Sequence, residues 1–240
     1  MTVALVTGAS RGLGRALAVG LADRGWSLVI DARHPDALAD SEAEVKTHLG
    51  AGARVVAIPG DVSDARHRRD LVAAAEGLGG LDLLVNNASD LGATPLPRIA
   101  DYPLDALRRV LEVNVVAPVA LVQEAAPLLR DSSAPAILNV TSDASVEAYE
   151  GWGGYGSSKA ALDHVGAVLA VEEPAVAVWT VDPGDMRTQM HQDAFPGEDI
   201  SDRPAPDTVV PALLSLVDRR PPSGRYRAAE CEPSDAAAER

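Results

Sequence analysis

The sequence contains little that could stabilise a fold covalently or build an aromatic core. Its 240 residues include one cysteine, Cys231, so no intramolecular disulfide can form. A reducing, cytoplasmic location is therefore expected. Aromatic residues make up 3% of the chain and hydrophobic residues 47%, so the core must consist of Ala, Val and Leu side chains. That composition fits a sheet of β-branched strands covered by Ala- and Leu-rich helices.

Positive charge is also scarce. The 21 Lys and Arg residues against 35 Asp and Glu give a formal net charge of −14. A surface this acidic repels nucleic acid and anionic lipid, so neither is an expected partner. The N-terminal MTVALVTGAS lacks the basic start and long apolar run of a signal peptide. No segment approaches the roughly 18 apolar residues of a membrane span. We expect no membrane association and no metal site.

Short apolar segments alternate with segments of helical periodicity along the chain. The predicted strands are residues 3–6, 27–31, 54–58, 81–85, 136–140, 175–181 and 224–227. The predicted helices are residues 12–24, 35–49, 64–78, 104–129, 156–171 and 208–217. Within or near the end of the fourth helix, Pro118 and Pro127 should bend or shorten it. This alternation predicts one α/β domain over residues 1–230, with a parallel sheet and helices on both faces.

Two segments fall outside that alternation. Residues 183–207 form a long connection rich in Pro, Gly, Asp and Met. Long connections in compact domains are usually lids or binding loops, so we expect a substrate lid over residues 185–207. Residues 231–240 are rich in Ala, Glu and Asp and are expected to be disordered.

The first predicted strand leads directly into the turn TGASRGLG, residues 7–14, where a helix begins. Gly8, Gly12 and Gly14 let the backbone turn sharply and approach a pyrophosphate. The N-terminus of the helix then offers free N–H groups and the positive end of its dipole. The alternative is a tight strand-to-helix turn without a ligand.

Further motifs follow in order: Gly60-Asp61-Val62, Asn86-Asn87-Ala88, Asn114, Ser142, Tyr155-Gly156-Ser157-Ser158-Lys159, and Pro183-Gly184 with Thr188. With the glycine turn, they resemble the smaller, single-domain class of the short-chain dehydrogenase/reductase family, which carries TGxxxGxG and YxxxK. The resemblance covers nearly the whole chain. It implies a Rossmann-type doubly wound sheet of about seven strands in the order 3-2-1-4-5-6-7. It also implies an oxidoreductase that acts on a small-molecule carbonyl or alcohol, a ketoreductase in the reducing direction.

The resemblance implies a bound nicotinamide cofactor. In the family, Asp61 binds the adenine amino group, Val62 packs near the ring, and Asn87 and Ala88 border the ribose. Asn86 is interpreted as support for the strand end. Thr188 is expected to hydrogen-bond the nicotinamide amide. The predicted cofactor-binding residues are Gly8, Ser10, Arg11, Gly12, Leu13, Gly14, Arg33, Asp61, Val62, Asn87, Ala88, Tyr155, Lys159, Pro183, Gly184 and Thr188.

The choice between NADP(H) and NAD(H) depends on the end of the second predicted strand. NAD favours an acidic residue there, whereas the 2′-phosphate of NADP adds roughly −1.5 to −2 charge and requires Arg or Lys. In the family the acidic residue stands seven positions after the glycine that begins the strand, which is Ala32 when counted from Gly25. Arg33 and Arg11 stand where NADP-dependent members place bases.

We therefore predict a preference for NADP(H). Asp31 is one position from the expected acidic residue, so its side chain should turn to the other face of the strand. If the count slips by one, Asp31 becomes the ribose ligand and the cofactor is NAD(H). Arg33 would then be a solvated loop charge.

Tyr155 and Lys159 are four residues apart on a predicted helix and therefore share a face. A lysine ammonium, like the oxidised nicotinamide ring, should lower the pKa of a tyrosine from about 10. The phenol could then exchange a proton with a substrate oxygen near neutral pH. Following the family, Ser142 holds the carbonyl oxygen, although the neighbouring Thr141 and Ser145 are alternatives. Asn114 is expected to kink the long helix and hold a water that relays protons to the lysine.

The expected walls of the substrate pocket are residues 89–96, 142–152 and 185–195. Trp152, Tyr149, Met186, Met190 and Phe195 are the candidate apolar contacts. The helices at residues 104–129 and 156–171 are expected to form a homodimer, or a homotetramer. The C-terminus lacks the Gly-rich segment that supports tetramers in many members. The alternative function is an NADP-binding regulatory or sensor protein on the same fold. An epimerase or dehydratase is disfavoured by the glycine spacing.

Overall fold

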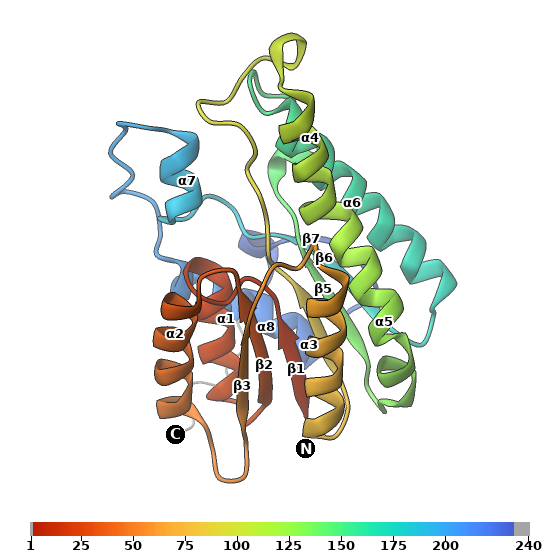
Figure 1. Ribbon diagram of the computed structural model, residues 1–240. Helices are drawn as coiled ribbons and strands as arrows, with labels where there is room; N and C mark the ends of the chain where they lie inside the picture. Colours follow the sequence, from red (N-terminus) through yellow and green to blue (C-terminus); the bar gives the residue numbers. More distant parts are fainter. Residues whose placement is uncertain (1, 233–240) are drawn as a thin grey trace.

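The computed structural model describes residues 2–232. Within them, seven parallel strands form one sheet in the order β3-β2-β1-β4-β5-β6-β7, which confirms the predicted fold (Figure 1). All neighbouring strands pair in parallel, as the βα alternation requires. The strands are β1 Val3–Val6, β2 Ser27–Ala32, β3 Val55–Pro59, β4 Leu83–Asn86, β5 Ala136–Val140, β6 Ala177–Asp182 and β7 Gly224–Arg227.

Helices cover both faces of the sheet (Figure 1). One face packs against α1 Gly12–Ala22, α2 Pro35–His48 and α8 Val210–Arg219. The other packs against α3 Ala65–Leu78, α5 Ala117–Asp131 and α6 Gly153–Glu172. Because alternate strand residues point to opposite faces, β1 supplies Ala4 and Val6 to the first core and Val3 and Leu5 to the second.

The long predicted helix is interrupted at Asn114. It consists of α4 Leu104–Leu111, a π-helical turn at Glu112–Val116, and α5. A π turn inserts an extra residue into the helix and often occurs at functional sites. Pro118 lies in the first turn of α5, directly after the π turn, and Pro127 lies inside α5.

One helix of the described chain, Leu104–Asp131, is long and apolar enough to cross a membrane by length and composition alone. A helix packed in the core of a domain meets the same criterion. Here one side of the helix packs against α3 and α6.

The connection after β6 contains a helix that the sequence pattern did not predict. Helix α7 comprises Gln189–Ala194. Thr188 caps its N-terminus, because the Thr188 hydroxyl accepts a hydrogen bond from the His191 N–H. Figure 1 shows α7 beyond the end of the sheet, on the same side as α1 and α2. Of the predicted disordered tail, residues 233–240 lie outside the described residues.

Helix α6 lies so close to the sheet that only glycine fits at one point of contact. A Cβ on Gly166 would overlap the Thr180 hydroxyl of β6. Gly77, near the end of α3, has no atom within 4 Å of the same position.

We predict that Gly166→Ala lowers the free energy of unfolding by roughly 1–3 kcal/mol, because the extra methyl forces α6 and β6 apart. The control Gly77→Ala should raise it by up to about 1 kcal/mol, because alanine is the better helix former. Urea unfolding followed by circular dichroism measures both. Equal stability of the two variants would contradict this view of the α6 packing.

Candidate active site

A cavity of about 780 Å³ opens at the carboxyl ends of the strands, where ligands bind in doubly wound sheets. It is lined by the glycine turn, the end of β2, the segments after β3, β4 and β5, the start of α6 and residues 182–191. Of the predicted catalytic and cofactor-binding residues, Asn114 alone lies outside this lining. Folding therefore gathers residues separated by up to about three quarters of the chain into one cavity.

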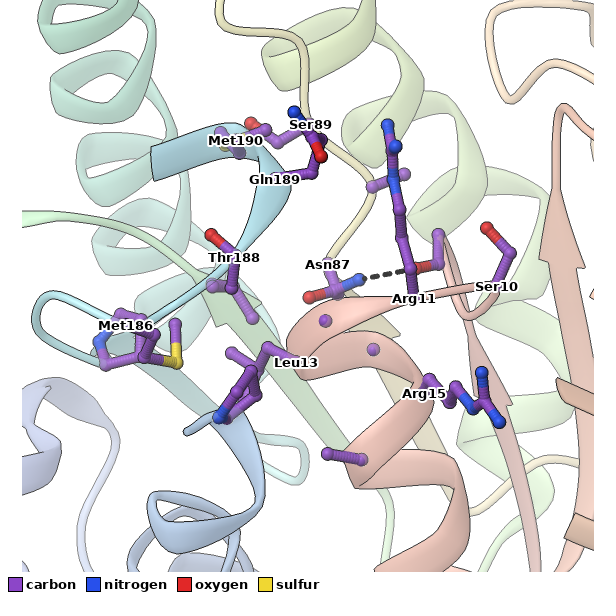
Figure 2. A pocket seen from close by; sticks show the side chains of 18 of the residues that line it. Ser10, Arg11, Leu13, Arg15, Asn87, Ser89, Met186, Thr188, Gln189 and Met190 are labelled. Atoms are coloured by element: carbon purple, nitrogen blue, oxygen red, sulfur yellow. Dashed lines mark hydrogen bonds between the residues drawn. The ribbon is translucent and has the colours of Figure 1, made fainter. Parts of the chain in front are cut away.

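The glycine turn fits against the end of β4 with no room to spare. A Cβ on Gly8 would lie 2.8 Å from the Ala88 Cα, and one on Gly14 would overlap the Gly8 carbonyl. The Thr7 hydroxyl accepts hydrogen bonds of 3.0 Å from the N–H groups of Asn87 and Ala88. The Asn87 side-chain amide donates to the Thr7 and Gly8 carbonyls at 2.7 and 3.1 Å (Figure 2).

This cradle meets the requirements of a dinucleotide cofactor. Side chains that would fill it are absent, and the N-terminus of α1 faces the cavity, where it can bind a pyrophosphate. Thr141 lines the same cavity, and its buried hydroxyl has no hydrogen-bond partner within residues 2–232. The same described residues contain no group of three or more His, Cys, Asp or Glu side chains that could hold a metal ion.

In the segment after β3, which also lines the cavity, the Asp61 carboxylate accepts several hydrogen bonds. It accepts from the Ser63 N–H and hydroxyl at 2.9 and 2.7 Å, and from the Arg109 guanidinium at 2.6 Å. Burial raises the pKa of Asp61, but these hydrogen bonds outweigh it and hold the pKa at about 2. Arg109 also lies 3.6 Å from Asp90, so it connects the segments that follow β3 and β4.

The Asp31 carboxylate is buried and both of its oxygens are engaged. One accepts from the Gly8 N–H at 2.8 Å, and the other lies 2.9 Å from Nε2 of the buried His67. Burial raises the pKa of Asp31, against the opposing effects of His67 and Gly8. His67 packs directly over Gly60, where a Cβ would overlap its ring. Asp31 thus supports the glycine turn through the Gly8 N–H, and it lines the cavity together with Ala32, Arg33 and Arg11.

Tyr155 and Lys159 share a buried face of α6, as their spacing predicted. The Lys159 Nζ lies 5.4 Å from the centre of the Tyr155 ring and donates to the Val140 carbonyl at 2.8 Å. Burial lowers the pKa of Lys159 to about 8, partly opposed by the charge of Asp163. Burial also raises the pKa of Tyr155, rather than lowering it as the sequence suggested. The low polarity around the ring disfavours the charged phenolate, and the hydrogen bond with Ser89 opposes this effect only in part.

Ser142, at the end of β5, lines the cavity together with Tyr155. Its hydroxyl donates to the neighbouring Asp143 carboxylate at 2.9 Å. Ser145, one of the alternatives to Ser142, donates instead to Asp163 at 2.6 Å and does not line the cavity. Arg225 from β7 donates to the Ser142 carbonyl at 3.1 Å and to Asp163 at 3.0 Å, which anchors this segment.

Asn114 holds the loop after β4 rather than lining the cavity. Its amide donates to the Asp90 carbonyl and the Ser158 hydroxyl, both at 2.9 Å, and its carbonyl oxygen accepts from the Asp90 N–H at 2.7 Å. Asn86 donates to Asn139 at 2.8 Å between β4 and β5, in keeping with its interpretation as support for the strand end.

Part of the predicted lid lines the cavity. Met186, Thr188, Gln189 and Met190 line it beside Leu13 and the start of α1 (Figure 2). Trp152 lines it too, with ring centres 5.7 Å from Tyr155 and 5.9 Å from Phe195. Phe195 thus packs behind Trp152, outside the lining. Tyr149 is also outside: it is exposed, and its hydroxyl donates to the Asp143 carboxylate at 2.9 Å.

Four side chains at this site were not anticipated from the sequence: His67, Arg109, Asp143 and Arg225. Three of them reach the site from α3, α4 and β7, and each contacts a residue at least 36 positions away. No local motif indicates such contacts. Asp143 is different, because its position beside Ser142 could have been read from the sequence.

Comparisons with known proteins agree on one family. The profile of the short chain dehydrogenases matches residues 2–199. A 3-oxoacyl-[acyl-carrier-protein] reductase of rhamnolipid biosynthesis from Pseudomonas aeruginosa is 39% identical over 176 residues, which cover 71% of this chain and 66% of that protein. Sepiapterin reductase from Bos taurus is 33% identical over 205 residues, covering 80% and 75%.

The similarity extends to solved structures. A proposed short chain dehydrogenase from Escherichia coli CFT073, complexed with NADPH, has a TM-score of 0.85 and 28% identity to this chain. The match covers 95% of this chain and 96% of the other.

We predict that the stability contributed by Asp61 depends on pH. Its pKa of about 2 lies below the usual 3.8, so the contribution is complete above about pH 4 and is lost as the pH falls toward 2. Asp61→Asn should therefore destabilise the protein at pH 7, by about 1 kcal/mol or less because the ion pair is partly exposed. The difference from wild type should shrink near pH 3 in urea unfolding.

The control for this experiment is Asp105→Asn, which removes a fully exposed carboxylate that pairs with Arg108 at the surface. A difference between Asp61→Asn and wild type that stays constant from pH 7 to pH 3 would count against the hydrogen bonds of Asp61 as its source.

Proposed function

The chain belongs to the short chain dehydrogenase/reductase family of CH–OH/C=O oxidoreductases, and on that premise we propose that it is an NADPH-dependent carbonyl reductase. The observation that carries the proposal is the convergence of Ser142, Tyr155 and Lys159 on one cavity with the glycine turn. The convergence matters because hydride and proton must reach adjacent atoms of the same carbonyl. A purely regulatory role is not favoured, since the named relatives are enzymes.

The proposed reaction adds a hydride to the carbonyl carbon and a proton to its oxygen, which yields an alcohol. When bound, NADPH supplies the hydride. Tyr155 supplies the proton from its buried phenol and regains one from solvent afterwards. Ser142 orients the substrate oxygen beside the phenol. Lys159 lies against the ring and stabilises negative charge there as the proton leaves. In the reverse direction, Tyr155 accepts the proton of the alcohol.

The cofactor would lie along the line from Asp61 to Thr188. The glycine turn would hold the pyrophosphate at the N-terminus of α1, and Asp61 and Val62 would border the adenine. For Asp61 to reach the adenine, the guanidinium of Arg109 must share or leave the carboxylate. A Cβ on Gly12 would lie 3.5 Å from the methyl group of Thr188. Thr188 is therefore close enough to the glycine turn to close the cavity on the nicotinamide side.

The contacts of Asp31 favour NADPH over NADH as the cofactor. Each oxygen of Asp31 already has a partner, Gly8 or His67, and the side chain is buried, which disfavours its use as a ribose ligand. The cavity instead exposes Arg11 and Arg33, which can neutralise a 2′-phosphate. The NADPH complex of the similar Escherichia coli protein is consistent with this choice.

We also propose the assembly, domain organisation and location of the protein. Exposed Leu104 and Val116 on α4 and its continuation, with Val168 and Val171 on α6, would be covered in a homodimer or homotetramer. Residues 1–230 would act as one domain with a lid at 185–207. The single cysteine suits the reducing cytoplasm.

We expect Tyr155→Phe to lower kcat at least about 100-fold, because the ring is kept while the proton donor is lost. The substrate is a panel of neutral ketones and aldehydes assayed with NADPH by absorbance at 340 nm. The dissociation constant of NADPH, from fluorescence titration, should stay within about threefold of wild type. Near-full turnover in this variant would exclude Tyr155 as the acid.

We expect Arg33→Ala to raise the KM for NADPH about tenfold or more and to change the KM for NADH little. A charge-assisted hydrogen bond to phosphate contributes roughly 1.5–3 kcal/mol, and solvent exposure reduces it. The matched control is Arg98→Ala, which removes an exposed charge outside the cavity. If wild type prefers NADH, and Asp31→Ala removes that preference, the cofactor is NAD.

A further inference from the structure

Arg109 is a cation of α4 that lines the cavity beside Asp61, and the proposed reaction does not use it. Its guanidinium donates from Nη2 to Oδ2 of Asp61 at 2.6 Å and from Nη1 to the Ser63 hydroxyl at 2.9 Å. Its Nε lies 3.6 Å from Oδ2 of Asp90. One side chain thus joins the segment after β3 to the segment after β4, and both segments line the cavity.

The contacts of the Asp61 carboxylate leave room for one further donor. A carboxylate has about four acceptor sites, divided between its two oxygens. Oδ1 accepts from the Ser63 N–H at 2.9 Å and from the Ser63 hydroxyl at 2.7 Å, so both of its sites are taken. Within residues 2–232, Oδ2 accepts a hydrogen bond from Arg109 alone. The open acceptor site is therefore on Oδ2, the oxygen that Arg109 holds.

Arg109 is itself fixed from its other side by Asp90. One oxygen of the Asp90 carboxylate accepts from the Gly92 N–H at 2.9 Å. The backbone of Asp90 exchanges hydrogen bonds of 2.7 and 2.9 Å with the Asn114 side chain. Arg109 thus neutralises two carboxylates of like charge, Asp61 and Asp90, which would repel each other without it. A guanidinium has several N–H donors in a rigid fork, so Arg109 can keep both contacts while a ligand binds.

The open site on Oδ2 of Asp61 accepts an N–H donor and repels an oxygen acceptor. Adenine carries an amino group that can donate there. Hypoxanthine carries a carbonyl oxygen on the same carbon, which would place an acceptor against a carboxylate. A carboxylate held in this position therefore distinguishes the two bases by one hydrogen bond.

We propose that Arg109 is a positioning residue that holds Asp61 with its open acceptor site toward the adenine amino group, and so makes the site selective for adenine dinucleotides. The proposal rests on the proposed binding of NADPH with its adenine beside Asp61. Arg109 stays on the carboxylate when the cofactor binds and shares it with the amino group. Without Arg109, the Asp61 side chain, which is 35% exposed, turns toward solvent because Asp90 repels it. Arg109 takes no part in hydride or proton transfer.

The test compares NADPH with its hypoxanthine analogue, which differs in the base alone, and measures both dissociation constants by fluorescence titration. For wild type, we expect NADPH to bind at least about tenfold more tightly, because the analogue loses a hydrogen bond to a charged acceptor. Arg109→Met should lower this ratio to about threefold or less, mainly by weakening the binding of NADPH. The kcat for ketone reduction at saturating NADPH should stay within about twofold of wild type, because the reacting end of the cavity is unchanged.

Arg108→Met is the matched control. Arg108 is the neighbouring arginine on α4, is exposed, pairs with Asp105 at the surface, and does not line the cavity. Its replacement should leave the ratio of dissociation constants as in wild type. Arg109→Lys keeps the charge but lacks the fork that grips Asp61 and Ser63 together, so its ratio should lie between those of wild type and Arg109→Met. Arg109→Lys also carries the test if Arg109→Met does not fold.

A double-variant cycle shows whether Arg109 acts through Asp61. Asp61→Ala removes the acceptor, so the ratio should fall as it does in Arg109→Met. Adding Arg109→Met to Asp61→Ala should lower the ratio no further, because two residues that act as one unit are not additive. A general effect of Arg109 on the fold would instead weaken both cofactors alike and leave the ratio unchanged.

Two outcomes would overturn the inference. The first is an Arg109→Met enzyme that keeps the wild-type ratio or binds NADPH more tightly, as expected of a group that only blocks the carboxylate. The second is a wild-type enzyme that binds NADPH and the analogue equally well, because Asp61 would then not contact the amino group. Failure of the proposed function looks different: Tyr155→Phe would then keep near-full turnover, whatever the two dissociation constants are.

Discussion

The contact between the glycine turn and the end of β4 is the constraint on which the site depends. Gly8 and Gly14 have no room for a side chain, because the Ala88 backbone and the Gly8 carbonyl occupy that space. The Thr7 hydroxyl and the Asn87 amide then fasten the two strand ends together. This contact fixes where α1 begins, and with it the N–H groups that face the cavity. The Asp31 carboxylate accepts a hydrogen bond from the Gly8 N–H and so stabilises the same turn.

Burial shapes the chemistry on the other side of the cavity. Tyr155 and Lys159 are both buried, and burial moves their pKa values in opposite directions, each toward the neutral form. Nearby charge then decides how readily a proton moves. Asp143 and Asp182 oppose phenolate at Tyr155, in a protein that is already strongly acidic. Arg225 donates to the Ser142 carbonyl and so anchors a residue that contacts Asp143 and lines the cavity.

Periodicity and motif order predicted most of the fold. Alternating β and α segments allow few arrangements of a parallel sheet, and the observed strand order is the predicted one. The sequence pattern failed at two short segments, helix α7 and the break at Asn114. Helix α7 is six residues long, which is too short for a helical period to emerge, so the sequence pattern predicts a loop there. The break at Asn114 is a π turn, and Pro118 lies in the first turn of α5 directly after it.

The sequence by itself determined the glycine turn and the shared face of Tyr155 and Lys159, because each follows from spacing along the chain. The strand order was predicted from the family resemblance of the motifs. Only the tertiary structure decided what Asp31 does: a count along β2 left its side chain open, and the fold supplied Gly8 and His67 as partners. It also moved Tyr149 out of the predicted pocket and directed the proton of Ser142 to Asp143. Hydrogen bonds and burial depend on which elements meet in space, and no period along the chain encodes those meetings.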